Sequence, residues 1–185
     1  IETEFAAKIN DMFRLDMGLS YGNWRYADDA TGTYRGSDGN DQAYSYSLKD
    51  LKVGDMPQAS LNLGLTASPA EGAAIQLTYR RYELFYSDWS PTSREFSDGE
   101  TPDRIQSWKI PGYGIVDLNA SYDLPFEFGG ASATVVLNVR NLFDEVYVQD
   151  ATDNSRYNAV PFRVNSHRAN AAEVYLGMPT AFNLG

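Results

Sequence analysis

The strongest constraint on the fold is an alternation of apolar and polar residues with a period of two, which recurs along the chain. It is clearest in residues 59–68, where Leu61, Leu63 and Leu65 share one parity and small or polar residues take the other. Successive side chains of a β-strand point to opposite faces, so this pattern predicts a strand with one apolar and one polar face. Comparable runs occupy residues 2–9, 13–21, 75–80, 116–122 and 132–140.

The last segment, residues 172–185, alternates less regularly and contains Pro179. Proline cannot donate a ladder hydrogen bond, so it marks a strand start, a bulge or an edge strand there. With this segment included, the sequence predicts seven strands and an all-β, antiparallel fold.

The connections between these strands alternate in length. Short ones lie at residues 10–12, 69–72 and 125–130, and long ones at residues 27–56, 87–112 and 144–170. Transmembrane β-barrels of the outer membrane have short periplasmic turns and long extracellular loops. The alternation therefore predicts a transmembrane barrel whose long loops are extracellular and whose C-terminus is periplasmic.

Aromatic residues gather near the predicted outer ends of the strands, among them Tyr21, Trp24, Tyr79, Tyr82 and Phe143. Such residues form girdles at the lipid headgroups of membrane barrels. A soluble β-sandwich, such as a carbohydrate-binding module, also has short alternating strands and stays as the alternative fold. It accounts neither for the loop lengths nor for the placement of the aromatics.

Composition excludes several other classes of protein. The formal charge is −10 without a basic patch, which argues against a nucleic-acid partner. There is no Cys, so disulfide scaffolds and thiolate metal sites are excluded. No apolar run approaches the roughly 20 residues that a membrane-spanning helix needs.

Residues 138–147, Asn-Val-Arg-Asn-Leu-Phe-Asp-Glu-Val-Tyr, resemble a signature found late in TonB-dependent receptors. Three weaker matches follow the same order as in that family. Residues 2–5 resemble a G-x-E-x-E strand, and residues 113–118 a Y-x-x-x-D strand. Residues 177–180 resemble the G-x-P-R opening of the closing strand, with Thr180 where Arg is usual.

The resemblance implies a 22-stranded barrel that encloses an N-terminal plug. Residues 1–185 would be one C-terminal segment of that barrel domain, with the plug and the remaining strands outside this chain. The resemblance further implies active uptake of a scarce nutrient, foremost a ferric siderophore, or else cobalamin or a glycan. The implied partners are the nutrient, the rest of the barrel and plug, TonB through the absent N-terminal part, and outer-membrane lipid and lipopolysaccharide. Neither a cofactor nor enzymatic activity is expected.

Ligand recognition is expected in the long loops, because loops carry specificity in scaffolds of this kind. Their aromatic and arginine side chains suit a ferric siderophore through stacking and charge, whereas aromatics beside Asp and Asn would suit a glycan. The candidate ligand-binding residues are Tyr34, Tyr44, Trp89, Arg104, Trp108, Arg156, Tyr157 and Arg163.

Charged residues also recur on the polar parity of the predicted strands. In a plugged barrel these side chains would face the plug or the water of the lumen, where they hold the plug or tune selectivity. The candidate lumen- or plug-facing residues are Glu2, Glu4, Arg14, Asp16, Arg80, Asp117 and Arg140.

Few residues suggest bond chemistry or metal binding. His167 is the only histidine, and a lone loop histidine is more often solvated or hydrogen-bonded than catalytic. The acidic runs at residues 38–41 and 150–154 read as turns, so no metal site is expected. A plug-less porin-like channel is the first rival function. The second, an outer-membrane enzyme, would need a Ser/His or Asp/His pair on one rim.

Overall fold

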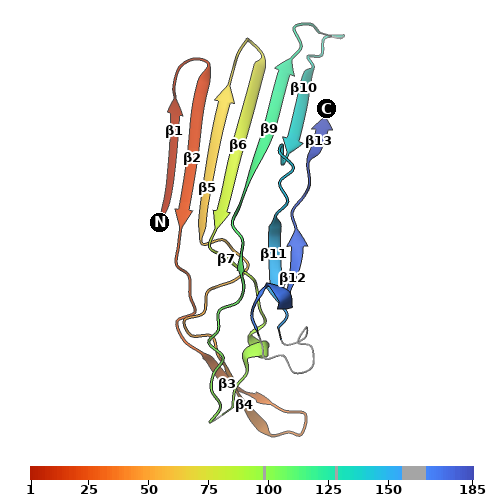
Figure 1. The fold of residues 1–185 in the computed structure, drawn as a ribbon. Helices are drawn as coiled ribbons and strands as arrows, with labels where there is room; N and C mark the ends of the chain where they lie inside the picture. The colour runs from red at the N-terminus through yellow and green to blue at the C-terminus, as the bar shows by residue number, and fades with distance from the viewer. Residues whose placement is uncertain (98, 128, 156–165) are drawn as a thin grey trace.

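The computed structural model describes residues 1–97, 99–127, 129–155 and 166–185. Its main element is one antiparallel sheet whose strands lie side by side in chain order, β1-β2-β5-β6-β9-β10-β13 (Figure 1). The strands are β1 (Glu2–Lys8), β2 (Phe13–Tyr21), β5 (Ala59–Ala67), β6 (Ala73–Glu83), β9 (Tyr113–Asp123), β10 (Thr134–Arg140) and β13 (Ala181–Leu184). The predicted all-β antiparallel class and the seven strands of this sheet are confirmed.

The register of the sheet keeps the two faces chemically distinct. Leu15 lies opposite Leu65, Leu65 opposite Leu77, and Leu77 opposite Leu118, so one row of the apolar face crosses four strands. The adjacent polar row starts with Asp16 opposite Gly64. A slip of one residue would exchange the faces of a strand, so the period-two pattern itself specifies this register.

Neither face of the sheet is covered by a second layer within the described residues. Apart from Gly64, every buried residue among them lies outside the seven strands. Apolar side chains of the sheet remain exposed, such as Phe5 (51%), Leu19 (46%) and Phe182 (78%). A soluble sandwich would bury this face against a second sheet, so the structure does not have the architecture of the alternative fold.

The three short turns lie at one end of the sheet and the three long loops at the other (Figure 1). We name the long loops the first loop (residues 22–58), the second loop (84–112) and the third loop (141–180). The first contains the hairpin of β3 (Ala30–Arg35) and β4 (Asp41–Tyr46). The second contains β7 (Phe85–Tyr86), the 3₁₀ turn η1 (Pro91–Arg94) and β8 (Lys109–Ile110).

The structure of the third loop differs from the sequence-based prediction, which gave residues 172–185 as a single strand. Residues 172–185 form two strands, β12 (Ala172–Leu176) and β13, separated by the segment that contains Pro179. β12 pairs with β11 (Val148–Asp153) rather than with β10, and the short turn η2 (Ala169–Ala171) precedes it. The β11–β12 pair continues beyond the sheet in line with β10 and β13 (Figure 1).

The residues of the Asn-Leu-Phe-Asp segment form the turn between β10 and β11. Asn141 has a φ of 49° and Asp144 a φ of 53°, a left-handed conformation that Asn and Asp adopt more readily than most residues. The Asn141 side chain accepts a hydrogen bond from the Glu145 N–H at 2.9 Å and donates to the carbonyl oxygens of Glu145 at 2.9 Å and Met178 at 3.0 Å. One amide thereby closes the turn and ties it to the start of the last strand.

A second set of bonds attaches this turn to its neighbours on both sides. The Asn141 N–H donates to the Asp117 carboxylate of β9 at 2.9 Å. The Thr180 N–H donates to the Asp144 carboxylate at 3.0 Å, and the Thr180 hydroxyl to the Asn141 carbonyl at 2.7 Å. The motif is therefore a structural joint between three strands.

Replacing Asn141 by Ala should lower the free energy of unfolding of the intact protein by about 2–4 kcal/mol, because it removes all three hydrogen bonds that the buried Asn141 amide makes with Glu145 and Met178. The matched control is Asp11→Ala, which removes an exposed ion pair of the short β1–β2 turn and should cost under about 0.5 kcal/mol. Urea unfolding in detergent measures both, and equal losses would contradict the assigned role of Asn141.

Candidate functional site: the joined long loops

The three long loops pack against each other beyond the end of the sheet, and their apolar contacts form two clusters. Leu48, Leu51 and Trp89 join the first loop to the second. Phe85, Ile110 and Ala151 join the second loop to the third, and Trp108 packs against this cluster. The protein's buried apolar core thus lies in its loops, which gives them a fixed mutual arrangement.

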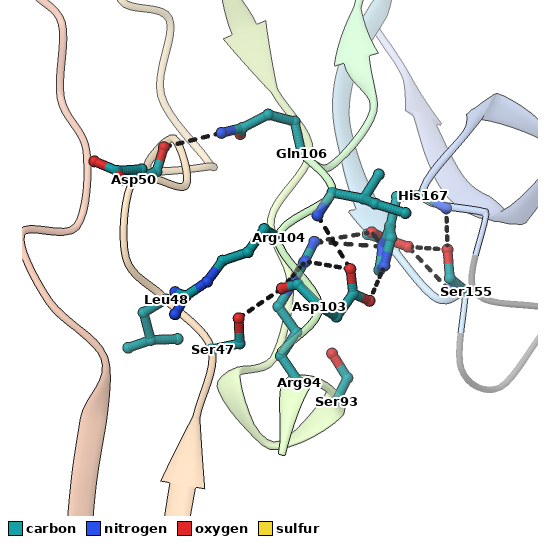
Figure 2. Close-up of polar contacts among 12 residues, drawn as sticks. Ser47, Leu48, Asp50, Ser93, Arg94, Asp103, Arg104, Gln106, Ser155 and His167 are labelled. Carbon is teal, nitrogen blue, oxygen red and sulfur yellow. Dashed lines mark hydrogen bonds and ion pairs between the residues drawn. The ribbon is translucent and has the colours of Figure 1, made fainter. Parts of the chain in front are cut away.

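Polar contacts reinforce the junction between the first and second loops (Figure 2). The Ser47 hydroxyl donates to the Asp103 carbonyl oxygen at 2.7 Å, and the Gln106 amide donates to the Asp50 carbonyl at 3.0 Å. Arg104 pairs with both carboxylate oxygens of Asp29, with Nη2 at 2.6 Å from Oδ2. This guanidinium, with backbone N–H donors of the first loop, holds the pKa of Asp29 well below its usual range.

A buried polar cluster joins the second loop to the third, and we call Arg94, Asp103, Asp153 and His167 the clasp (Figure 2). His167 Nδ1 lies 2.5 Å from Asp153 Oδ2, and its Nε2 lies 2.7 Å from Asp103 Oδ2. The backbone N–H of His167 donates to the Ser155 hydroxyl at 2.9 Å. The side chains of His167 and Asp153 are each 3% exposed, so solvent hardly screens these contacts.

The two carboxylate contacts favour a doubly protonated His167, against the Arg94 Nη2 donor that lies 3.3 Å from Nδ1. Each ring nitrogen faces a carboxylate oxygen, and a carboxylate only accepts, so both contacts are hydrogen bonds when both nitrogens donate. Burial disfavours the imidazolium, but the hydrogen bonds to Asp153 and Asp103 outweigh it and raise the pKa of His167. Burial likewise opposes ionisation of the two carboxyl groups, and the contacts with His167 nevertheless lower the pKa of each.

Arg94 supplies the second cation of the clasp from η1. Its side chain is fully buried, and Nη1 lies 3.5 Å from Asp103 Oδ1 and Nη2 4.0 Å from Asp153 Oδ2. Its guanidinium stacks over the ring of Trp89, 4.7 Å from the centroid. With His167 protonated, two cations balance two carboxylates, which is the condition under which buried charges are tolerated.

The clasp does contain an Asp/His pair on the loop rim, which is what the enzyme rival requires, but its geometry does not fit a reaction. Both ring nitrogens of His167 are occupied by carboxylates, so neither can take a proton from a nucleophile. The nearby Ser155 hydroxyl donates to Asp153 at 2.5 Å and does not contact the imidazole. The pair is also almost closed to solvent.

The structure separates the predicted ligand-binding residues into different settings. Tyr34 and Tyr44 lie together on the β3–β4 hairpin with ring centroids 6.4 Å apart, and Tyr44 stacks on Tyr46 at 5.0 Å. Tyr34 is 52% exposed, whereas Trp89 is 5% exposed and belongs to the loop core. Trp108 is half-buried against the second cluster, and Arg104 is engaged by Asp29.

Arg156, Tyr157 and Arg163 lie outside the described residues. Of the clasp residues, Asp103 was not singled out from the sequence, Arg94 was noted only as one of the loop arginines, and Asp153 only within the acidic run 150–154. They stand far apart in the chain and follow no periodicity, so only the folded loops reveal them as a group. His167 stood out in the sequence only as a lone side chain without its partners.

The predicted lumen-facing residues share the polar parity of the sheet and form two ion pairs within it. Arg14 and Asp16 pair along β2 at 2.8 Å, and Arg80 of β6 pairs with Asp117 of β9. Glu2, Glu4 and Arg140 form no salt bridge within the described part of the chain. This face therefore keeps charges for a further contact or for water.

A pocket of about 550 Å³ opens on this polar face beside the β10–β11 turn. Arg80, Asp117 and Arg140 line it together with three tyrosines whose rings contact one another in a row. The rings of Tyr82 and Tyr113 are 5.2 Å apart, and those of Tyr113 and Tyr147 are 4.3 Å apart.

The described residues contain neither a metal-binding cluster nor a membrane-spanning helix. Groups of three or more His, Cys, Asp or Glu that could hold a metal ion are absent from that part of the chain. No helix there is long and apolar enough to cross a membrane.

The sheet is apolar on one face and charged on the other, and its long loops are joined at one end. These features define the class of an outer-membrane β-barrel. A comparison with known protein families matches residues 1–142 to the family described as TonB dependent receptor-like, beta-barrel. The chain belongs to this family, whose members transport ligands across the outer membrane. A search of curated proteins finds no match.

Replacing Gly54 by Ala should loosen the junction between the first and second loops. The added Cβ would meet the Ser87 carbonyl oxygen at 2.6 Å and the Asp88 Cα at 2.8 Å, and these backbone atoms cannot move independently. Faster amide hydrogen exchange is expected in residues 84–90, with the seven-stranded sheet unchanged.

Gly36→Ala in the same loop is the control for Gly54→Ala. Its added Cβ would meet the flexible side-chain ends of Asp38 and Gln42, so exchange in the second loop should not change. Unaltered exchange in residues 84–90 of the Gly54 variant would contradict the close packing of the two loops.

Proposed function

We propose that this chain forms a C-terminal part of the barrel of a TonB-dependent receptor that imports a scarce nutrient. A ferric siderophore is the foremost ligand, with cobalamin or a glycan as alternatives. The observation that carries the proposal is the sheet itself, because within the described residues no second layer covers its apolar face and Glu2, Glu4 and Arg140 of the opposite face form no salt bridge. Lipid would cover the apolar face, and a plug or lumen water would solvate the charged face.

The direction of the barrel follows from the loop lengths. Long loops on the extracellular side and short turns in the periplasm match the usual arrangement of such barrels. With this orientation the C-terminus is periplasmic, and lipopolysaccharide and lipid contact the apolar face.

The polar face would be the side of the sheet that meets the plug or the lumen. Glu2, Glu4 and Arg140 are the charges open to a partner there, and the pairs Arg14–Asp16 and Arg80–Asp117 add polar surface. TonB would act through the plug, so its contact lies outside these residues.

The remainder of the barrel would pair with the two edges of the sheet, β1 and β13. An unpaired strand edge in hydrocarbon leaves backbone N–H and C=O groups unsatisfied, at several kcal/mol each. Strands of the same barrel satisfy these groups by closing the sheet.

Among the loop residues, the best-placed ligand contacts are the stacked tyrosines of the β3–β4 hairpin. Tyr34 offers an exposed ring, and the tilted ring of Tyr44 lies beside it and stacks on Tyr46. Aromatic faces of this kind bind flat or cationic groups and sugar rings. Arg104 and Trp108 lie in the neighbouring second loop and would contribute from there.

Arginine substitutions at two adjacent residues of β5 test the lipid-facing assignment. Leu63→Arg places a charge on the apolar face and should destabilise the receptor in bilayers by about 2–4 kcal/mol. Asn62→Arg, at nearly the same depth on the polar face, should cost less than about 1 kcal/mol. Unfolding in lipid vesicles measures both, and an inverted order would show that the faces are assigned wrongly.

Growth of a strain that lacks the full-length receptor tests transport. On individual ferric siderophores, cobalamin and glycans as limiting sources, we expect a defect on one source, restored by the gene and reproduced by loss of TonB. No defect on any source would contradict the proposed uptake. A defect that does not depend on TonB would favour the porin-like channel instead.

A further inference from the structure

The contacts that His167 makes depend on whether its imidazole is protonated. It lies in the third loop after the segment 156–165, and its ring fills the space between Asp103 of the second loop and Asp153 of β11. The Asp103 backbone also accepts the hydrogen bond of Ser47 from the first loop. A single imidazole therefore joins the third loop to the second and, through Asp103, to the first (Figure 2).

The charges around His167 decide what happens when it loses its proton. The charged groups that face it within the described residues are Asp103, Asp153 and Arg94. With the imidazolium present, the clasp carries no net charge. A neutral ring would leave two buried carboxylates against Arg94 alone, and one ring lone pair would point at a carboxylate oxygen.

We propose that His167 is a proton-operated switch: its imidazolium holds Arg94 and Asp103 of the second loop against the third loop, and loss of the proton frees this part of the second loop while the Phe85–Ile110–Ala151 cluster stays in place. Closure also fixes Trp89, which Arg94 covers, and Arg104, which follows Asp103 directly. The switch would thereby position the loop surface that the proposed function uses for ligand. Only this last consequence rests on the proposed function.

The direction of the pH dependence follows from the groups in the clasp. Burial lowers and the two carboxylate contacts raise the pKa of His167, and the contacts prevail over burial and over the Arg94 cation. The closed state is therefore fully present below the ordinary histidine pKa of about 6.5 and is lost as the pH rises through the raised value. Asp103 and Asp153 keep their charge throughout this range, because the pKa of each is lowered.

One substitution distinguishes a switch from a merely structural contact. In Asp103→Asn, a neutral imidazole can donate from Nδ1 to Asp153 while Nε2 accepts from the side-chain amide that the substitution introduces. Arg94 and Asp153 then balance each other without a proton on Nε2. The backbone contacts of residue 103 with Ser47 and Arg94 are unaffected. This variant should hold the loops closed at any moderate pH.

The test measures the distance between spin labels on the second and third loops of the full-length receptor in lipid. Cysteines replace two exposed residues, Thr101 and Val174, and any cysteine elsewhere is removed. At about pH 5.5 we expect a narrow distance distribution, and at about pH 9.5 a reversibly broader one. His167→Gln should give the broad distribution at both pH values, and Asp103→Asn the narrow one at both.

The same distribution in the unmodified receptor at both pH values would overturn the proposal, as would a pH response in His167→Gln equal to that of the parent. Barrel folding of each variant is checked by its heat-modifiable migration on gels. If Asp103→Asn fails this check, the parent and His167→Gln still decide the outcome. The measurement uses neither ligand nor transport, so it can succeed or fail independently of the proposed uptake.

Discussion

Every other feature of this structure depends on a sheet that the described residues of this chain cover on neither face. A soluble sheet buries its apolar face against another layer, and the buried residues are then found in the strands. Here the apolar face stays open while the ladders keep leucines of neighbouring strands in register, as for Leu15, Leu65 and Leu77. Such a face is stable only against hydrocarbon, and membership of the TonB-dependent receptor-like barrel family supplies that environment.

Among the described residues the buried apolar core lies in the loops and not against the sheet. Leu51 and Trp89 bind the first two loops together, and Ile110 and Ala151 bind the second to the third. The clasp adds a polar joint at the same end. This packing keeps the long loops in one arrangement beyond the sheet, where a receptor must present a defined surface rather than flexible chain.

The sheet could be predicted from the sequence, because a strand between lipid and a polar interior must alternate residue by residue. The arrangement of the loops could not. Trp89 was expected at a ligand surface and lies in the loop core, because its neighbours come from another loop. Residues 172–185 were expected as one strand, but Pro179 and the Asn141 turn divide them. His167 looked solitary, since its partners are 64 and 14 residues away in the chain.

A nitroxide scan of residues 59–67 in the reconstituted receptor would show whether one face of the sheet meets lipid and the other a polar interior. Collision rates with oxygen should peak at Leu61, Leu63 and Leu65, and a water-soluble nickel chelate should have no access to these positions. At the intervening residues oxygen access should fall. Oxygen access that does not alternate along β5, or that peaks at Asn62 and Thr66, would show that the apolar face does not meet lipid.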